Sequence, residues 1–181
     1  MASQDKKYPP VKRNILLNPG PSTTTDTVKY AMVVPDICPR EKEFGQVMQT
    51  LSEELVKIAH GGLKDYAAVI FCGSGTLCLD VCVNSLLDKD KYAFVINNGA
   101  YSQRAVDILK YYGMQHIEFK QPIDTTPDLN EVEEALKKNI SEGKKIGYVY
   151  MTHHETVSGL LNPLREVGAL AHKYNAIFIS D

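Results

Sequence analysis

The sequence has no excess of charge of either sign. Its 181 residues include 20 Lys and Arg against 22 Asp and Glu, a formal net charge of −2. Proteins that bind nucleic acid or anionic membranes through their overall charge carry a basic surplus, so partners of these kinds are not expected. No linker, internal repeat or low-complexity tract divides the chain, and its length suits one domain with a sizeable core.

Long hydrophobic runs are also missing. Residues 1–14, MASQDKKYPPVKRN, are polar and contain no apolar segment of the signal-peptide type. No later stretch approaches the roughly 20 apolar residues that span a bilayer. We therefore expect a cytoplasmic protein without a membrane partner, in which residues 1–13 form a disordered arm.

Cysteine is scarce, and its spacing carries no metal signature. The four cysteines include no C-x-x-C pair; they are Cys38, Cys72, Cys78 and Cys82. Three of them have apolar neighbours in or beside one predicted helix. This pattern favours buried, reduced thiols over metal ligands or a disulfide.

A regular alternation of strand-like and helical patterns begins at Ala67. Short apolar runs predict strands at 67–71, 92–96, 116–119, 146–151 and 176–180. Apolar residues spaced by three and four predict helices at 76–87, 102–112, 128–140 and 164–174. Strands joined by helices form a parallel sheet, so we predict an α/β large domain, mostly parallel with flanking helices. It spans residues 63–181, after an N-terminal segment over 14–62 that has a short strand and a helix at 41–59.

A glycine-rich turn joins the first predicted strand to its helix. In FCGSGT, residues 71–76, two glycines allow a tight turn, and the hydroxyls of Ser74 and Thr76 add donors at a helix N-terminus. The turn suits a phosphate, or it is a plain strand-to-helix turn capped by Thr76. It is not a P-loop, because no lysine follows. The dinucleotide fingerprint is incomplete, because Cys78 replaces its third glycine and no acid ends the strand at 92–96.

An aromatic residue and an acid follow two other predicted strands. Tyr101, in NNGAY, suits a planar ligand ring, although by itself such a tyrosine is more often a partly buried loop residue. Asp181 ends AIFISD, where it is either an acid of a site or the N-cap of a following helix. Parallel strands deliver their C-terminal loops to one edge of the sheet, so we expect these residues and the glycine-rich turn to share a site.

The segment HHET invites a metal interpretation. His153, His154 and Glu155 are adjacent, and adjacent residues of an extended segment point to opposite sides. A third ligand at a known spacing is also missing, so we expect no metal site. Hydrogen bonds to a substrate or to neighbouring strands are the favoured role for these side chains.

Several segments together resemble a known family. LLNPGP and TTTDTVKYAMVVPDICPREKEF, followed in order by GSGT, NNGAY and HHET, are similar to the class V aminotransferases, which are pyridoxal 5′-phosphate (PLP) enzymes of fold type I. Within that group the resemblance is to the 2-aminoethylphosphonate:pyruvate aminotransferases, and it covers residues 15–181. It implies the fold type I large domain, PLP as cofactor and a homodimer. The implied reaction converts 2-aminoethylphosphonate and pyruvate to phosphonoacetaldehyde and alanine.

The resemblance also implies roles for individual residues. It places the cofactor phosphate on Ser74, Gly75 and Thr76, and the pyridine ring against Tyr101. It assigns the remaining contacts as follows: Thr156 near the phenolic oxygen, Asp181 on the pyridine nitrogen, and Asn18 and Gly20 on the substrate. The charge of Asp181 would keep the pyridine nitrogen protonated, so that the ring accepts electrons.

Two features depart from the family pattern. The family's Schiff-base lysine lies a few tens of residues beyond the strand that ends in the acid, so we expect this lysine to be absent from the chain. The chain would then be truncated within the large domain. We expect the chain alone to be inactive. Lys144, Lys145 and Lys173 fall on predicted helix and loop positions away from the site edge. Val157 occupies a position where a hydroxyl is expected.

Three other interpretations remain open at this point. One is another class V activity, of the alanine:glyoxylate or serine:pyruvate type, which shares the cofactor loops and differs in substrate contacts. Another is a nucleotide-binding Rossmann domain, whose fingerprint is incomplete here. The third is a non-catalytic fragment of the PLP fold that binds the cofactor, a partner or nothing.

Overall fold

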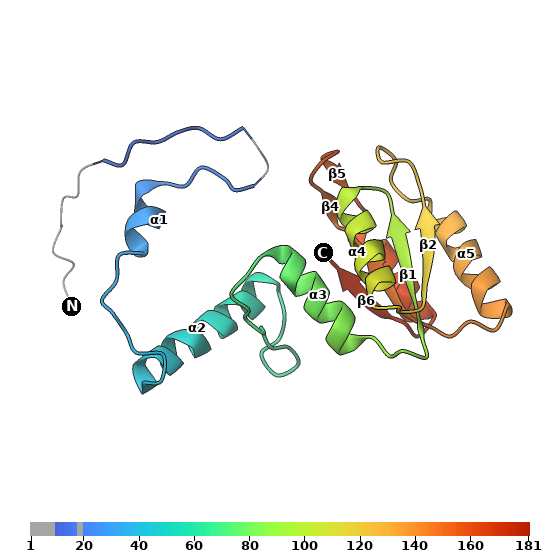
Figure 1. The fold of residues 1–181 in the computed structure, drawn as a ribbon, viewed down its shortest axis with the longest axis horizontal. Helices are drawn as coiled ribbons and strands as arrows, with labels where there is room; N and C mark the ends of the chain where they lie inside the picture. Colours follow the sequence, from blue (N-terminus) through green and yellow to red (C-terminus); the bar gives the residue numbers. More distant parts are fainter. Residues whose placement is uncertain (1–9, 18–19) are drawn as a thin grey trace. The chain divides into compact units, whose positions relative to one another are not determined.

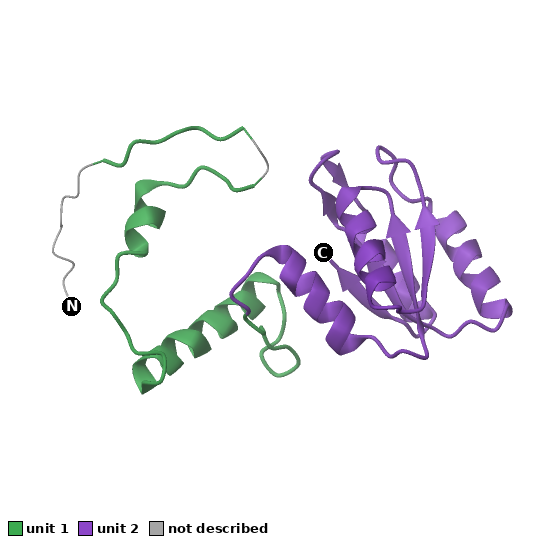
Figure 2. Cartoon of the chain, in the orientation of Figure 1, with its two compact units in different colours: residues 1–70 green, residues 71–181 purple. Residues whose placement is uncertain are grey.

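The computed structural model describes residues 10–17 and 20–181. The chain forms two compact units, residues 1–70 and 71–181 (Figure 1; Figure 2). Most of the predicted arm at 1–13 and the predicted substrate residue Asn18 lie outside the described residues. Within the described ranges, no helix is long and apolar enough to cross a membrane.

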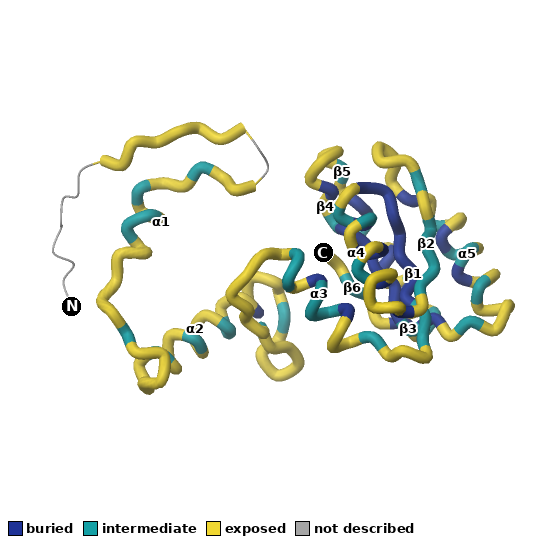
Figure 3. The backbone as a smooth tube through the Cα atoms, viewed as in Figure 1, coloured by how far each residue is buried: buried dark blue, intermediate teal, exposed yellow. Residues whose placement is uncertain are grey.

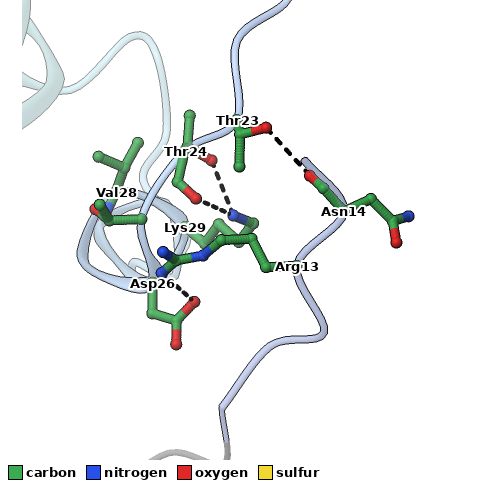
Figure 4. A network of polar contacts seen from close by, with 8 residues as sticks. Arg13, Asn14, Thr23, Thr24, Asp26, Val28 and Lys29 are labelled. Atoms are coloured by element: carbon green, nitrogen blue, oxygen red, sulfur yellow. Dashed lines mark hydrogen bonds and ion pairs between the residues drawn. The ribbon is translucent and has the colours of Figure 1, made fainter. Parts of the chain in front are cut away.

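The described part of the first unit contains two helices, α1 (Asp26–Ala31) and α2 (Lys42–Ile58). Helix α2 confirms the helix predicted at 41–59. The short strand predicted at its start is wrong, because residues 10–17 form no strand. Side-chain bonds replace a strand ladder there: the Thr23 hydroxyl donates to the Asn14 carbonyl (3.1 Å) and accepts from the Leu16 N–H (2.8 Å). Figure 4 shows the bond between Thr23 and Asn14, together with the Lys29 ammonium, which donates to Thr24.

The second unit is built on a four-stranded parallel sheet in the order β2-β1-β3-β6. The strands are β1 (Tyr92–Asn97), β2 (His116–Lys120), β3 (Ile146–Met151) and β6 (Ile177–Ser180). The helices are α3 (Gly75–Leu86), α4 (Ala100–Tyr111), α5 (Leu129–Ser141) and α6 (Leu164–Lys173). A two-stranded antiparallel hairpin, β4 (His154–Glu155) and β5 (Leu160–Leu161), follows β3. The predicted α/β architecture is confirmed, with these four strands and helices close to their predicted bounds.

Both faces of the sheet are covered, as the apolar runs of its strands predict (Figure 3). Alternate residues of β1 serve opposite faces: Val95 packs in a cluster with residues of α3 and α4, and Phe94 in a cluster with residues of α5 and α6. Phe94 is fully buried and stacks on Phe119 of β2, with ring centroids 5.8 Å apart. The sheet is therefore packed between α3 and α4 on one face and α5 and α6 on the other.

One predicted strand is wrong. Residues 67–71 have no regular secondary structure, and Val69 is 79% exposed. An apolar run shows that a segment is suited to burial, but a strand also needs a hydrogen-bonded neighbour. Among the described residues, no strand pairs with this segment. The sheet of the described chain therefore has four strands, where the sequence pattern predicts five.

The cysteines differ from the prediction in burial. All four are free thiols, as expected, but Cys38, Cys72 and Cys78 are exposed and only Cys82 is half-buried. Helix α3 buries Leu79 and Val83, so the two cysteines of this helix lie beside its buried stripe. Partial burial raises the pKa of the Cys82 thiol. Apolar neighbours in the sequence were a poor guide because they are not the neighbours in space.

A carboxylate on α5 ties this helix to α6. Glu133 accepts hydrogen bonds from the Lys173 ammonium (2.7 Å) and the Tyr174 hydroxyl (2.6 Å), and it pairs with Lys137 (3.1 Å). These donors, Lys173 first, lower the pKa of Glu133 to about 2. The folded-state pKa thus lies below that of the unfolded chain, so the interaction stabilises the fold above about pH 4.5 and is lost as the pH falls towards 2.

We expect Glu133→Gln to lower the urea midpoint of unfolding slightly at pH 7, because the partners are exposed and screened. The difference from wild type should shrink as the pH falls below about 4.5, where the unfolded chain takes up a proton. Urea titrations from pH 7 to pH 3 measure this. Glu134→Gln is the matched control, and an undiminished difference at pH 3 would show that charge is not the cause.

Candidate functional site

The N-terminus of α3 forms a donor-rich turn. Ser74 is the N-cap: its hydroxyl oxygen accepts from the Leu77 N–H (3.4 Å), and its carbonyl oxygen accepts from the same group (2.9 Å). The alternative in which Thr76 caps the helix is therefore wrong, because Thr76 lies inside its first turn. The first N–H groups of a helix have no carbonyl partner within it. Those of Gly75 and Thr76 are thus available for an anion, which the helix dipole also favours.

An aromatic ring and a cation come from the first two turns of α4, which begins shortly after the end of β1. The Arg104 guanidinium lies over the ring of Tyr101, 4.8 Å from its centroid. It also donates to the Thr76 hydroxyl (2.9 Å), and so places a positive charge beside the start of α3. Arg104 is not among the residues singled out from the sequence. The available signal was its spacing of three from Tyr101, which puts both side chains on one face of a helix.

Asp181 follows β6 and is held by β3. Its backbone N–H donates to the Met151 carbonyl (3.2 Å), and its carbonyl accepts from the His153 N–H (2.8 Å). The hydroxyl of Tyr150 donates to the Asp181 side-chain oxygen Oδ2 (3.3 Å). Burial raises the pKa of Tyr150, so this phenol keeps its proton and remains a donor. The carboxylate is thereby oriented at the C-terminal edge of the sheet.

These elements enclose a cavity of about 260 Å³. Its lining consists of Ser74, Gly75, Thr76, Leu79, Tyr101, Arg104 and Asp181. The structure thus brings together five of the residues singled out from the sequence and adds a cation and an apolar floor. One part of the lining carries N–H groups and a guanidinium, and another carries a carboxylate. The cavity therefore suits a ligand that has an anionic group and a proton-bearing group.

The remaining sequence candidates lie elsewhere. Thr156 is exposed in the turn between β4 and β5 and does not line this cavity. Val157, on the same turn, is 70% exposed. Gly20 belongs to the first unit and is exposed, and Asn18 falls outside the described residues. The roles assigned to Thr156, Gly20 and Asn18 stay predictions.

The HHET segment does not form a metal cluster in the described part of the chain, where no three His, Cys, Asp or Glu side chains converge. His154 is exposed and Glu155 is fully buried, so the two adjacent side chains point to opposite sides, as expected. Glu155 accepts hydrogen bonds from the start of α4. Glu155 does form hydrogen bonds, but the predicted partners are wrong for this residue: a helix start takes the place of a strand or a substrate.

The fold is that of PLP-dependent aminotransferases. A pyridoxamine-pyruvate aminotransferase from Mesorhizobium loti superposes with a TM-score of 0.84 at 24% identity, over 96% of this chain and 43% of that chain. An alanine–glyoxylate aminotransferase from Nostoc sp. gives a TM-score of 0.81 at 24% identity, over 94% and 44%. At these identities the likeness establishes the fold.

The family follows from the sequence match. The pattern of the aminotransferase class-V family covers residues 27–181, and this chain belongs to that family. A bifunctional phosphonoacetaldehyde hydrolase/aminoethylphosphonate transaminase from Clostridioides difficile is 38% identical over 96% of this chain and 27% of its own length. A 2-aminoethylphosphonate–pyruvate transaminase from Lysinibacillus sphaericus is 34% identical over 92% and 44%. The chain thus spans less than half the length of these relatives.

Proposed function

We propose that this chain provides the cofactor-binding part of a PLP-dependent transaminase that transfers the amino group of 2-aminoethylphosphonate to pyruvate. The cavity at the sheet edge carries the proposal, because an anion cradle, an aromatic ring and a carboxylate line one space. The choice of substrate is supported by relatives that are named for this reaction. A homodimer and a cytoplasmic location are the further expectations for the whole protein.

The first turn of α3 fits the phosphate of the cofactor. The N–H groups of Gly75 and Thr76 and the hydroxyls of Ser74 and Thr76 are donors at a positive helix end. Arg104 stands beside them, bonded to Thr76. A phosphate there would gain a charge-assisted partner as well as neutral donors.

Tyr101 and Asp181 fit the ring of the cofactor. A flat pyridine ring can pack against the aromatic side chain of Tyr101. The Asp181 carboxylate, oriented by Tyr150, can hold the proton on a ring nitrogen. Bound there, PLP would supply a ring that accepts the electrons left on the substrate carbon when that carbon loses its proton. Such chemistry also uses a lysine amine, and the cavity lining includes none, so we propose that this lysine lies outside these 181 residues.

The decisive experiment uses the protein as its own source makes it. Its intact mass is compared with that of the 181-residue chain. Turnover with PLP is measured as alanine formation for 2-aminoethylphosphonate or serine with pyruvate, and as glycine formation for alanine with glyoxylate. Turnover that prefers 2-aminoethylphosphonate with pyruvate over the other two pairs supports the proposal. Preference for another pair would overturn the substrate assignment. A mass equal to that of the chain, with no turnover of any pair, would leave a non-catalytic fragment.

Cofactor binding is tested separately through Arg104. We expect Arg104→Met to weaken binding of PLP by about tenfold or more, because a charged donor to phosphate is lost. Arg165→Met on α6 is the control, since Arg165 is exposed and lies outside the cavity lining. Absorbance titrations measure the affinity. Equal affinities for the two variants would show that Arg104 does not contribute to cofactor binding.

A further inference from the structure

A buried carboxylate lies against the N-terminus of α4. Glu155 is fully buried, and its Oε1 atom accepts from the N–H groups of Tyr101 (3.2 Å) and Ser102 (3.0 Å) and from the Ser102 hydroxyl (3.1 Å). Its Oε2 atom lies 3.4 Å from the Tyr101 nitrogen. Among the described residues, no Lys or Arg forms an ion pair with it. The carboxylate is therefore stabilised by helix N–H groups and a hydroxyl, not by a cation.

Helix α4 depends on this distant residue for its cap. Its own N-cap is Gly99, which has no side chain to accept from the first N–H groups. Glu155 takes that role from the β4–β5 hairpin, 54 positions further along the chain than Tyr101. Its negative charge also lies at the positive end of the helix dipole. A cap supplied from another element fixes where the helix begins, as well as stabilising it.

Gly99 makes room for the carboxylate. A Cβ atom at this position would lie 2.1 Å from the Glu155 Cδ atom. The backbone of Gly99 is extended (φ −175°), a conformation that any residue adopts, so the glycine is required for space and not for its backbone freedom. The missing side chain of Gly99 thus leaves the space that the Glu155 carboxylate occupies at the start of α4.

Further buried bonds connect the same elements. The Ser102 hydroxyl, which meets Glu155, also lies 3.1 Å from the Asn97 side-chain oxygen at the end of β1. Asn98, the next residue, exchanges side-chain hydrogen bonds with Asn162, which follows β5 (2.8 and 3.3 Å). The end of β1, the hairpin and the start of α4 therefore form one hydrogen-bonded assembly.

We propose that Glu155 is a positioning residue for the cofactor cavity, acting through the first turn of α4. It does not line the cavity itself, but it holds the backbone of Tyr101, whose ring does. Arg104 stands one turn further along the same helix and moves with it. This inference rests on the proposed function for its effect on cofactor binding, and on the structure alone for its effect on the helix.

The test uses Glu155→Gln, with Glu166→Gln as the control for an exposed glutamate in the first turn of α6. Amide exchange of Tyr101 and Ser102 should accelerate at least tenfold in Glu155→Gln and stay unchanged in the control. Affinity for PLP should fall by about tenfold. Unchanged exchange at both amides would overturn the proposal, whatever the affinity.

A double-mutant cycle separates positioning from general stability. If Glu155 acts through Tyr101, the loss of PLP affinity caused by Glu155→Gln should largely disappear in a Tyr101→Ala background. Additive losses would contradict the proposal. Ser102→Ala, which removes one donor, serves if Glu155→Gln does not fold, and should accelerate exchange at Tyr101 in the same direction. If the wild-type protein binds no PLP, the proposed function fails, while amide exchange still decides the role of Glu155.

Discussion

Replacing Asp181 by asparagine in the whole natural protein is expected to lower kcat by about 10²- to 10³-fold. A loss of this size is usual when one preorganised electrostatic partner is removed. The physical reason is the loss of a fixed negative charge at the position where the cavity would hold a ring nitrogen. An asparagine can accept a hydrogen bond there, but it cannot compensate a positive charge. The Tyr150 hydroxyl would still find an acceptor, so the local structure should be retained.

The measurement compares kcat for alanine formation between wild type, Asp181→Asn and Glu166→Gln. The control removes a carboxylate of similar exposure from α6, outside the cavity lining, and should leave kcat within a factor of two. Titration with PLP shows whether the variant still binds cofactor, which separates loss of catalysis from loss of binding. A kcat for Asp181→Asn equal to that of the control would contradict the assigned role.

Gly99→Ala is expected to destabilise the 181-residue chain by about 3 kcal/mol, which combines overpacking with weakened bonds to a buried carboxylate. The added Cβ atom would meet the Glu155 Cδ atom at 2.1 Å. Neither group can move freely, because the carboxylate is bonded to two backbone N–H groups and α4 packs on the sheet. Urea denaturation measures the change in the free energy of unfolding.

Two comparisons make this prediction specific. Gly75→Ala adds a methyl group where no atom lies within 4 Å, and it should change stability by less than about 1 kcal/mol. Glu155→Ala removes the group that the methyl would strike, so Gly99→Ala should cost less in that background than in wild type. An equal cost in both backgrounds would mean that the contact with Glu155 is not the cause.

The helices and strands of the second unit were largely predictable, because their sequence patterns are local. The apolar runs at 92–96 and 146–151 predicted β1 and β3, because strands buried on both faces leave a plain signal. The run at 67–71 carried the same signal and failed, because pairing depends on a neighbour that the run itself does not specify. An apolar run therefore indicates that a segment could form a buried strand. Whether it does so depends on a neighbouring strand with which it can pair.

Some residues of the candidate site could likewise be predicted from the sequence, and others could not. Tyr101 and Asp181 could be found because each follows a strand, and the topology of a parallel sheet gathers the loops after its strands at one edge. Ser74 could be found because glycines and hydroxyls mark the start of a helix. The partners of Arg104 and Glu155 could not be predicted. Their roles depend on contacts with Thr76 and with the start of α4, across 28 and 54 positions of the chain. No regular spacing connects residues so far apart.

The buried side-chain amides of Asn98 and Asn162 limit the substitutions that this chain tolerates at the two positions. Each amide donates to the other, and each uses its second N–H on a backbone carbonyl, that of Thr125 or Thr152. The two side chains are therefore complementary in the manner of a base pair. An aspartate at either position alone would set acceptor against acceptor, at the cost of an unsatisfied buried group. Substitutions that survive at one of these positions should be matched by a compensating substitution at the other.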